Sequence, residues 1–150
     1  MQQLRQNPLP GIKMKLIINT DGLSKGNPGP AAIGATLKDS KGKIVAIIAE
    51  TIGITTNKVA DYRALIAALE KALKLGAKEV EIRSDSELMV RQISGRYKVK
   101  SEGLKPLCLA AGKLLAKFNA VKITHIPREQ NTEADELANL AIQAKKMTEK

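Results

Sequence analysis

The stretch that determines the fold is Asn19-Thr20-Asp21-Gly22-Leu23-Ser24-Lys25-Gly26-Asn27-Pro28-Gly29-Pro30-Ala31-Ala32-Ile33-Gly34, and the other elements of the chain can be assigned starting from it. The apolar run Leu16–Ile18 leads into it and predicts a buried strand that ends at Asp21. Four glycines follow within thirteen residues, and glycine allows tight turns and close approach of other groups. A carboxylate beside a Gly-rich turn is compatible with a metal or phosphate site and with an ordinary hairpin turn. The other carboxylates of the chain decide between them.

Length and composition predict one globular domain. The chain has 150 residues, of which 43% are hydrophobic and 27% charged. No apolar stretch approaches the roughly 18 residues that span a bilayer, which predicts no membrane partner. Residues 1–13 are polar, lack the apolar core of a signal peptide and are expected to form a disordered leader. The domain is expected over residues 14–145, followed by a frayed basic tail at 146–150. A single cysteine, Cys108, suits a reducing, cytoplasmic location.

The net charge of +10 predicts a polyanionic partner, since phosphates supply most of the affinity in nucleic-acid binding. Only three aromatic residues are present, Tyr62, Tyr97 and Phe118, which argues against binding single strands by base stacking. A duplex held by its backbone fits better. Many surface lysines can also serve solubility alone.

Hydrophobic patterning predicts an α/β fold. Three strands joined by short turns, at residues 15–21, 31–38 and 43–52, form an antiparallel meander. A long helix follows, capped within Thr55-Thr56-Asn57 and closed by Gly76. The later predicted elements are a strand at 80–83, helices at 86–94 and 104–118, a strand at 121–126 broken by Pro127, and a last helix capped by Asn131 or Thr132. This order predicts a five-stranded mixed sheet with helices on both faces.

Four aspartates lie at the ends of these predicted elements. Asp21 and Asp85 end strands, while Asp61 and Asp135 are expected in the first turns of the long helix and the last helix. Each has an ordinary explanation as a helix cap or as a partner of a helix dipole, and Thr132 with Asp135 is compatible with a capping box. Four carboxylates on one rim would repel one another unless divalent cations neutralised them. Two such ions about 4 Å apart can hydrolyse a phosphodiester.

Four short motifs, in this order and spacing, resemble type 1 ribonuclease H over about residues 14–145. They are Thr20-Asp21-Gly22 with Asn27-Pro28-Gly29, Thr56-Asn57 with Ala60-Asp61-Tyr62, Ser84-Asp85-Ser86, and Asn131 with Ala134-Asp135. The segment Ile93–Lys100 also resembles the short connector of compact archaeal-like and Gram-positive-like members. Each motif alone is weak, and their combination is specific.

The resemblance implies a ribonuclease H-like fold and an endoribonuclease that cleaves the RNA strand of RNA/DNA hybrids, leaving a 5′-phosphate. It implies two Mg²⁺ ions as cofactors, with Mn²⁺ as a substitute. Asp21, Asp85 and Asp135 match the catalytic, metal-binding aspartates, and Asp61 occupies the position of the fourth acid. The positions that match substrate contacts are Gly22, Asn27, Thr56, Asn57 and Ser86. Short amides and hydroxyls can bond phosphates or a 2′-OH.

A basic connector at residues 95–103 is a further candidate for substrate binding. Arg96, Lys98 and Lys100 are spaced by two, so an extended segment would place them on one side. The alternative is a solvated loop without a partner.

Two departures from the family pattern bear on activity. Asp61 stands where the family has Glu, and its shorter side chain withdraws the carboxylate by about one bond. Misplacement of about 1 Å can cost about a hundredfold in rate. Many members also carry a histidine in the loop before the last helix, whereas His125, the only histidine here, lies inside the last predicted strand. Glu129 in that loop is a candidate for assisting product release, although a solvated surface role is favoured.

The sequence leaves other classes of function open. The first alternative is a catalytically impaired domain that binds RNA/DNA or double-stranded RNA. In this alternative, Asp61 in place of Glu is the sign that catalytic activity has been lost. A small-molecule phosphatase is the second, but it lacks a recognisable nucleophile motif. Retention of the other three aspartates favours the enzyme. Double-stranded RNA remains an open substrate, and a monomer is expected.

Overall fold

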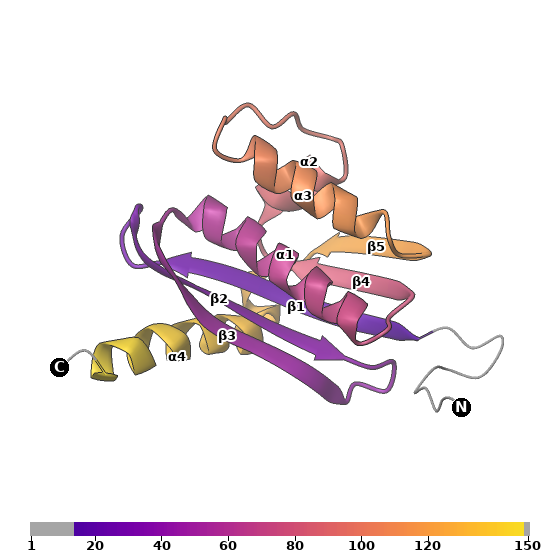
Figure 1. Cartoon of the computed structure of the whole chain (residues 1–150), viewed down its shortest axis with the longest axis horizontal. Helices are drawn as coiled ribbons and strands as arrows, with labels where there is room; N and C mark the ends of the chain where they lie inside the picture. The colour runs from indigo at the N-terminus through magenta and orange to yellow at the C-terminus, as the bar shows by residue number, and fades with distance from the viewer. Residues whose placement is uncertain (1–13, 149–150) are drawn as a thin grey trace.

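The computed structural model describes residues 14–148, which form five strands and four α-helices (Figure 1). The strands are β1 (Lys15–Ser24), β2 (Gly29–Lys38), β3 (Ile44–Thr55), β4 (Glu79–Ser84) and β5 (Ala120–His125). The helices are α1 (Asn57–Lys74), α2 (Glu87–Ile93), α3 (Lys105–Leu115) and α4 (Thr132–Thr148), with a short 3₁₀ turn, η1 (Arg128–Gln130), before α4.

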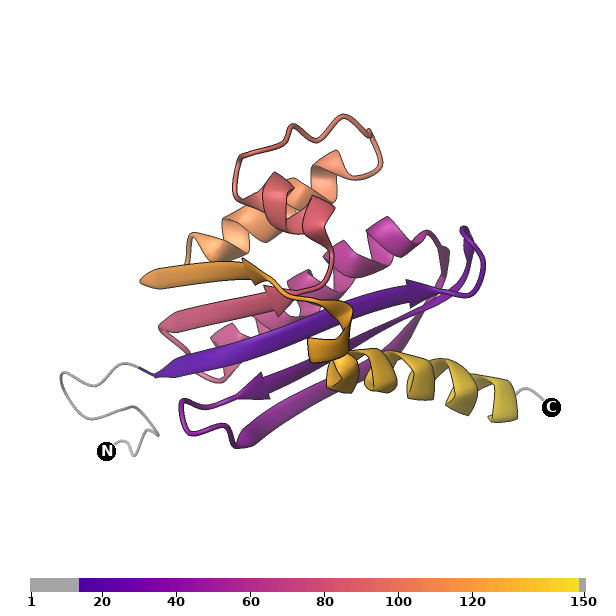
Figure 2. The same ribbon diagram turned by 180° about the vertical axis from the view of Figure 1, so that it is seen from behind.

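The strands form one mixed sheet in the order β3-β2-β1-β4-β5. β1, β2 and β3 are antiparallel neighbours, which confirms the predicted meander. β4 joins β1 in parallel, and β5 joins β4 in parallel. α1 and α3 cover one face of the sheet (Figure 1), and α4 lies on the other face (Figure 2), so the predicted α/β fold with helices on both faces is confirmed.

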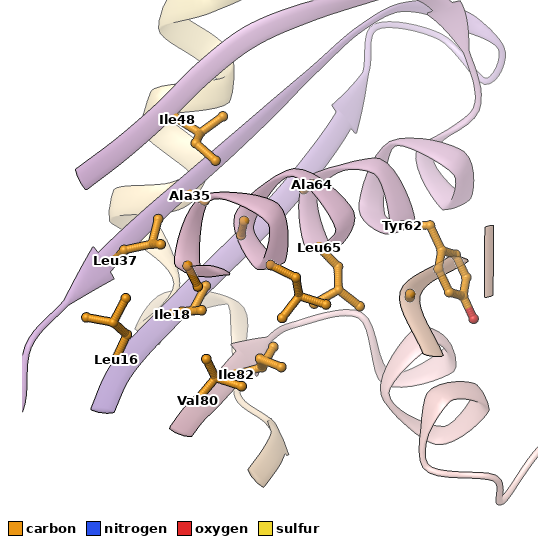
Figure 3. Packing of buried hydrophobic residues seen from close by; sticks show 14 of the residues in the cluster. Leu16, Ile18, Ala35, Leu37, Ile48, Tyr62, Ala64, Leu65, Val80 and Ile82 are labelled. Atoms are coloured by element: carbon orange, nitrogen blue, oxygen red, sulfur yellow. The ribbon is translucent and has the colours of Figure 1, made fainter. Parts of the chain in front are cut away.

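The main core fills the space between α1 and the sheet. Leu16 and Ile18 of β1 and Val80 and Ile82 of β4 point toward α1, whose Leu65 is fully buried among them (Figure 3). In each strand the two inward residues are separated by one residue that faces the other way, as the period of two in a strand requires. A smaller cluster, in which Ala138 and Ile142 of α4 pack on Ala32 of β2, holds α4 to the opposite face.

Several element boundaries differ from those predicted. β1 does not end at Asp21 but continues to Ser24, because Asp21 to Ser24 still pair with β2. Asp61 is the fifth residue of α1 rather than part of its first turn, since the helix begins at Asn57 after its N-cap Thr56. α4 continues to Thr148, past the expected domain end at 145. The expected leader at 1–13 lies outside the described residues.

No helix within residues 14–148 has the length and apolar character required to cross a membrane.

Candidate active site

The parallel pairing of β1 with β4 brings the first two aspartates together. The last pair in that register is Thr20 with Ser84, and the residues that follow them are Asp21 of β1 and Asp85, which comes directly after β4. Carboxyl ends of parallel strands open onto one edge of a sheet, where ligands of α/β proteins bind. Asp21 is 8% exposed. The predicted convergence of these two side chains is therefore confirmed.

Helix α1 reaches this edge through a close contact with β1. A Cβ atom on Gly22 would lie 2.2 Å from the carbonyl carbon of Ala60, which leaves room only for glycine. The backbone N–H of Gly22 donates to Oδ1 of Asp61 at 3.1 Å. Gly22 thus sets both the distance of α1 from β1 and the orientation of the Asp61 carboxylate.

Helix α4 reaches the same edge by a similar contact on the other face of the sheet. Gly34 of β2 pairs directly with Asp21 of β1. A Cβ atom on Gly34 would lie 2.1 Å from the carbonyl oxygen of Ala134, so α4 rests against the backbone of β2. Asp135, the next residue of α4, is thereby brought to the edge that holds Asp21.

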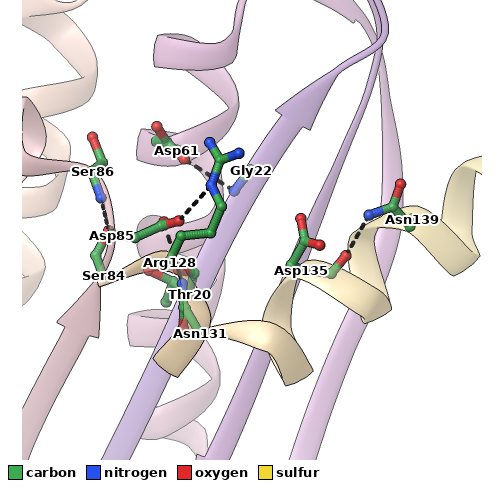
Figure 4. Close-up of polar contacts among 10 residues, drawn as sticks. All are labelled: Thr20, Gly22, Asp61, Ser84, Asp85, Ser86, Arg128, Asn131, Asp135 and Asn139. Carbon is green, nitrogen blue, oxygen red and sulfur yellow. Dashed lines mark hydrogen bonds and ion pairs between the residues drawn. The ribbon is translucent and has the colours of Figure 1, made fainter. Parts of the chain in front are cut away.

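All four aspartates line one pocket of about 370 Å³. Figure 4 shows Asp61 and Asp85 on one side of the site and Asp135 on α4 across from them. The lining residues are Asp21, Gly22, Leu23, Ser24, Lys25, Asn57, Asp61, Asp85, Ser86, Arg128, Asp135 and Asn139. The four carboxylates predicted as catalytic and metal-binding therefore share one site.

Burial and mutual repulsion make this site costly to ionise. The pKa of Asp21 is raised far above its ordinary value, first by burial and then by the nearby Asp85, Asp135 and Asp61 carboxyls. The pKa of Asp61 is raised to about 7, chiefly by burial, although the N–H of Gly22 opposes the shift. A nearby cation would reverse both shifts because it favours the ionised forms.

The donor set fits a hard divalent cation. Carboxylate oxygens are the ligands that Mg²⁺ and Mn²⁺ prefer, and the site offers four carboxylates in one pocket. The one ion pair made by these acids joins Arg128 Nε to Asp85 Oδ2 at 3.7 Å, and the Arg128 side chain is 88% exposed. Within residues 14–148 no three acidic, histidine or cysteine side chains stand gathered as a ready-made metal cluster.

The predicted substrate residues divide into two groups. Gly22, Asn57 and Ser86 line the acidic pocket. Asn27 and Thr56 instead make local structural bonds, since Asn27 Oδ1 accepts from Asn57 N–H at 3.0 Å and Thr56 Oγ1 accepts from Val59 N–H at 3.2 Å. The Thr56 bond confirms the predicted N-cap of α1. The role of these five residues in binding substrate stays a prediction.

The basic connector lies apart from the acidic pocket. Arg96, Lys98 and Lys100 line a separate hollow of about 630 Å³, together with Lys58 from the first turn of α1. Arg91 of α2 stacks over the Tyr97 ring at 5.3 Å from its centroid. The structure thus gathers four basic residues of the connector and α1 around one concave surface.

Three further contacts in or beside the pocket were missed by sequence reasoning. Asn131 was expected to cap α4, yet its side chain points into the sheet, where Nδ2 donates to the Thr20 carbonyl at 2.9 Å and approaches Asp85 Oδ1 at 3.4 Å. Lys25 Nζ donates to Asn139 Oδ1 at 3.0 Å. The only indication of these contacts in the sequence was the position of Asn139, about one helical turn after Asp135.

The expected capping roles of Thr132 and Asp85 are not found. Thr132 is the first residue of α4, and the N-cap of α2 is Ser86, whose Oγ accepts from Met89 N–H at 3.3 Å. Asp85 is therefore available to the pocket. His125 belongs to the last strand, as predicted, but it is the final residue of β5 and not an interior one. Glu129 lies in η1 with an exposed side chain.

Comparison with known proteins supports one family. A family described as "Reverse transcriptase-like" matches residues 19–141. Ribonuclease HI of Halobacterium salinarum is 46% identical over 122 residues, which cover 81% of this chain and 61% of that protein. The chain belongs to the ribonuclease H family.

Solved ribonuclease H structures share the fold. The ribonuclease H1 of Halobacterium salinarum superposes with a TM-score of 0.85 at 43% identity, covering 87% of this chain and 98% of the other. LC11-RNase H1, solved in complex with an RNA/DNA hybrid, gives a TM-score of 0.82 at 46% identity, covering 86% and 97%. The chain spans 36% of a bifunctional Mycobacterium tuberculosis relative that is 46% identical over 132 residues, covering 87% of this chain.

Proposed function

We propose that this ribonuclease H family member is a metal-dependent endoribonuclease that hydrolyses the RNA strand of RNA/DNA hybrids and leaves a 5′-phosphate. The observation that carries this proposal is the meeting of four aspartates, from β1, α1, α4 and the end of β4, in one pocket. The hybrid bound to LC11-RNase H1, which shares this fold, supports the choice of substrate.

Each aspartate has a role that follows from its position. Asp21, the most central of the four, would bind the cations together with Asp85 on the neighbouring strand. Asp61 and Asp135 would complete the ligand set from the helices on the two faces. When bound, the two Mg²⁺ ions, or Mn²⁺ in their place, supply activation of the attacking water and stabilisation of the leaving oxygen.

Polar residues in and beside the pocket would orient the substrate and the acids. Asn131 holds the start of α4 against β1 and lies beside Asp85, so it fixes the position of α4 relative to β1 and Asp85. Asn57 Oδ1 accepts from Ser24 N–H at 2.8 Å and joins the β1–β2 loop to α1. The hydroxyl and amide groups along this rim suit contacts with the sugar–phosphate backbone of a duplex.

Cleavage of an end-labelled hybrid tests the proposal directly. We expect products with Mg²⁺, faster cleavage with Mn²⁺, and none in EDTA. Asp85→Asn should abolish cleavage while leaving hybrid binding in EDTA equal or stronger, because the change removes a ligand and also a negative charge near phosphate. Glu136→Gln, an exposed change on α4, is the matched control. More than a few per cent of residual activity in Asp85→Asn would exclude Asp85 as a metal ligand.

A second candidate function, a binding domain with an impaired site, is favoured by one feature only, the aspartate at position 61. It predicts hybrid or double-stranded RNA binding without cleavage in either metal. Running both duplexes side by side in the same assay separates an enzyme for hybrids, an enzyme for both duplexes and a pure binder.

We also propose a monomeric protein of a reducing, cytoplasmic compartment. The compartment is supported by the single cysteine, Cys108, which is half-buried and cannot form a disulfide within the chain. Sedimentation of the purified protein tests the monomer.

A further inference from the structure

Lys25 presents a positive charge at the mouth of the acidic pocket. It follows the last residue of β1 and lines the pocket together with the four aspartates. Its Nζ donates to Asn139 Oδ1 at 3.0 Å, and Asn139 Nδ2 in turn donates to the Asp135 carbonyl at 3.0 Å. The ammonium is therefore placed against α4, at Asn139.

The backbone that carries Lys25 is firmly held. Lys25 N–H donates to the Pro30 carbonyl at 2.8 Å, and Ser24 Oγ donates to the Thr55 carbonyl at 2.8 Å. A Cβ atom on Gly29 would lie 2.1 Å from the Lys25 carbonyl oxygen, so the two ends of the loop are packed together. An exposed lysine on so constrained a loop can act as a fixed point for a ligand.

No acidic side chain within residues 14–148 forms an ion pair with Lys25. None of the ion pairs in the described part of the chain includes Lys25, and its side-chain partner is the neutral amide of Asn139. Arg128, the other basic residue of the pocket, pairs with Asp85. The two basic groups thus have different partners, Arg128 the carboxylate of Asp85 and Lys25 the amide of Asn139 on α4.

We propose that Lys25 is a substrate-binding residue that contacts a phosphate of the cleaved strand adjacent to the scissile one. This inference rests on the proposed function. The cations held by the aspartates would neutralise the scissile phosphate, and the next phosphate along the strand would need a separate positive group. Because the Lys25 ammonium is hydrogen-bonded to the neutral amide of Asn139, it can exchange that amide for a phosphate oxygen without breaking an ion pair.

Lys25→Met tests this contact because it keeps the length of the side chain and removes the charge. Hybrid binding is measured in EDTA over a range of KCl concentrations, and cleavage is measured with Mg²⁺. We expect the slope of log K against log salt to become shallower by about one unit, as for one lost phosphate contact. KM should rise severalfold with kcat little changed, and Lys25→Arg should retain most of the affinity. Lys41→Met, in the β2–β3 turn at the opposite end of the sheet, is the matched control.

Asn139→Ala separates this contact from a purely structural bond. If Lys25 binds phosphate, Asn139→Ala keeps the wild-type salt slope. If Lys25 only ties the loop to α4, Lys25→Met and Asn139→Ala give the same loss with the slope unchanged, which overturns the inference. An unaltered slope and KM in Lys25→Met also overturn it. A wild-type protein that neither binds nor cleaves the hybrid refutes the proposed function itself, and this inference with it.

Discussion

Asp61 is the residue on which the activity of this site depends most directly. It stands where the family pattern has glutamate, and its carboxylate is held by the N–H of Gly22 at 3.1 Å. Helix α1 cannot move closer to compensate for the shorter side chain, because Ala60 already rests against Gly22. The carboxylate position is therefore set by side-chain length.

Lengthening this side chain should increase activity. We expect Asp61→Glu to raise Mg²⁺-dependent cleavage by about ten- to a hundredfold, since rates depend steeply on ligand placement. Mn²⁺ should help the wild-type protein more than the variant. Steady-state cleavage of the hybrid by both proteins in both metals provides the measurement. If the variant is slower in Mg²⁺ and in Mn²⁺, the site has adapted to aspartate and the short-ligand explanation is wrong.

The raised pKa of Asp61 predicts a pH-dependent stability in the absence of metal. Its folded pKa of about 7 exceeds its ordinary value of 3.8, so the folded state favours the protonated form. The resulting stabilisation is complete below pH 3.8 and is lost as the pH rises through about 7. Added Mg²⁺ should restore stability on the alkaline side because it favours the carboxylate.

Thermal unfolding in EDTA measures this effect. Between pH 4 and about 7 the wild-type Tm should fall relative to that of Asp61→Asn, which cannot ionise. Mg²⁺ should raise the wild-type Tm more at alkaline than at acidic pH. Parallel Tm profiles for the two proteins in EDTA would show that Asp61 does not titrate in this range.

At the scale of elements, the site depends on two helices that approach the sheet more closely than usual. Gly22 admits α1 to one face and Gly34 admits α4 to the other, and each of these glycines lies beside Asp21, one next in sequence and one across the strand pair. A side chain at either position would displace the helix that carries an aspartate. A change in the packing of either helix would therefore also change the positions of the aspartates.

Gly34→Ala should test this coupling. The new methyl group would overlap the Ala134 carbonyl and push α4 outward, costing about 1–3 kcal/mol of unfolding free energy. Displacement of Asp135 by about 1 Å should lower cleavage by about a hundredfold. Denaturant unfolding and hybrid cleavage are the measurements. Gly112→Ala in α3 is the control, because its Cβ would meet nothing within 4 Å and alanine favours a helix. Equal effects of the two substitutions would contradict the argument.

At the scale of the whole molecule, charge is unevenly distributed. The chain carries a net charge of +10, yet the pocket that holds the four aspartates is acidic, and the basic hollow around Arg96, Lys98 and Lys100 lies elsewhere. A long polyanion can be attracted by the basic surface while its scissile phosphate reaches the acids only with cations present. A duplex is long enough to contact both regions.

Neutralising Arg96, Lys98 and Lys100 together should weaken hybrid binding and make its salt slope shallower by up to about three units, one for each lost phosphate contact. Neutralising Lys41, Lys43 and Lys78, at the end of the sheet opposite the aspartates, is a control with the same change in net charge. Fluorescence anisotropy over a range of KCl concentrations separates the two. Identical slopes for both triple variants would assign the connector a solvated surface role.

The sequence alone determined the order of the elements, the mixed sheet and the four aspartates of the site. These features follow from local patterns: apolar alternation in the strands, helical spacing in the long helices, and caps such as Thr56. The convergence of Asp21 and Asp85 was also predictable, because adjacent parallel strands end on one edge.

Only the tertiary structure decided which other side chains complete the pocket. Asn131 contacts Thr20 across 111 residues, and Lys25 contacts Asn139 across 114. Such contacts depend on how closely and at what angle α4 packs on the sheet, and no local pattern encodes that. The same applies to the end of β1, where pairing with β2 rather than strand propensity carries the strand past Asp21. From its position before α4, the Asn131 side chain could have accepted a hydrogen bond from the first turn of the helix. In the folded chain its amide instead donates to the buried Thr20 carbonyl of β1.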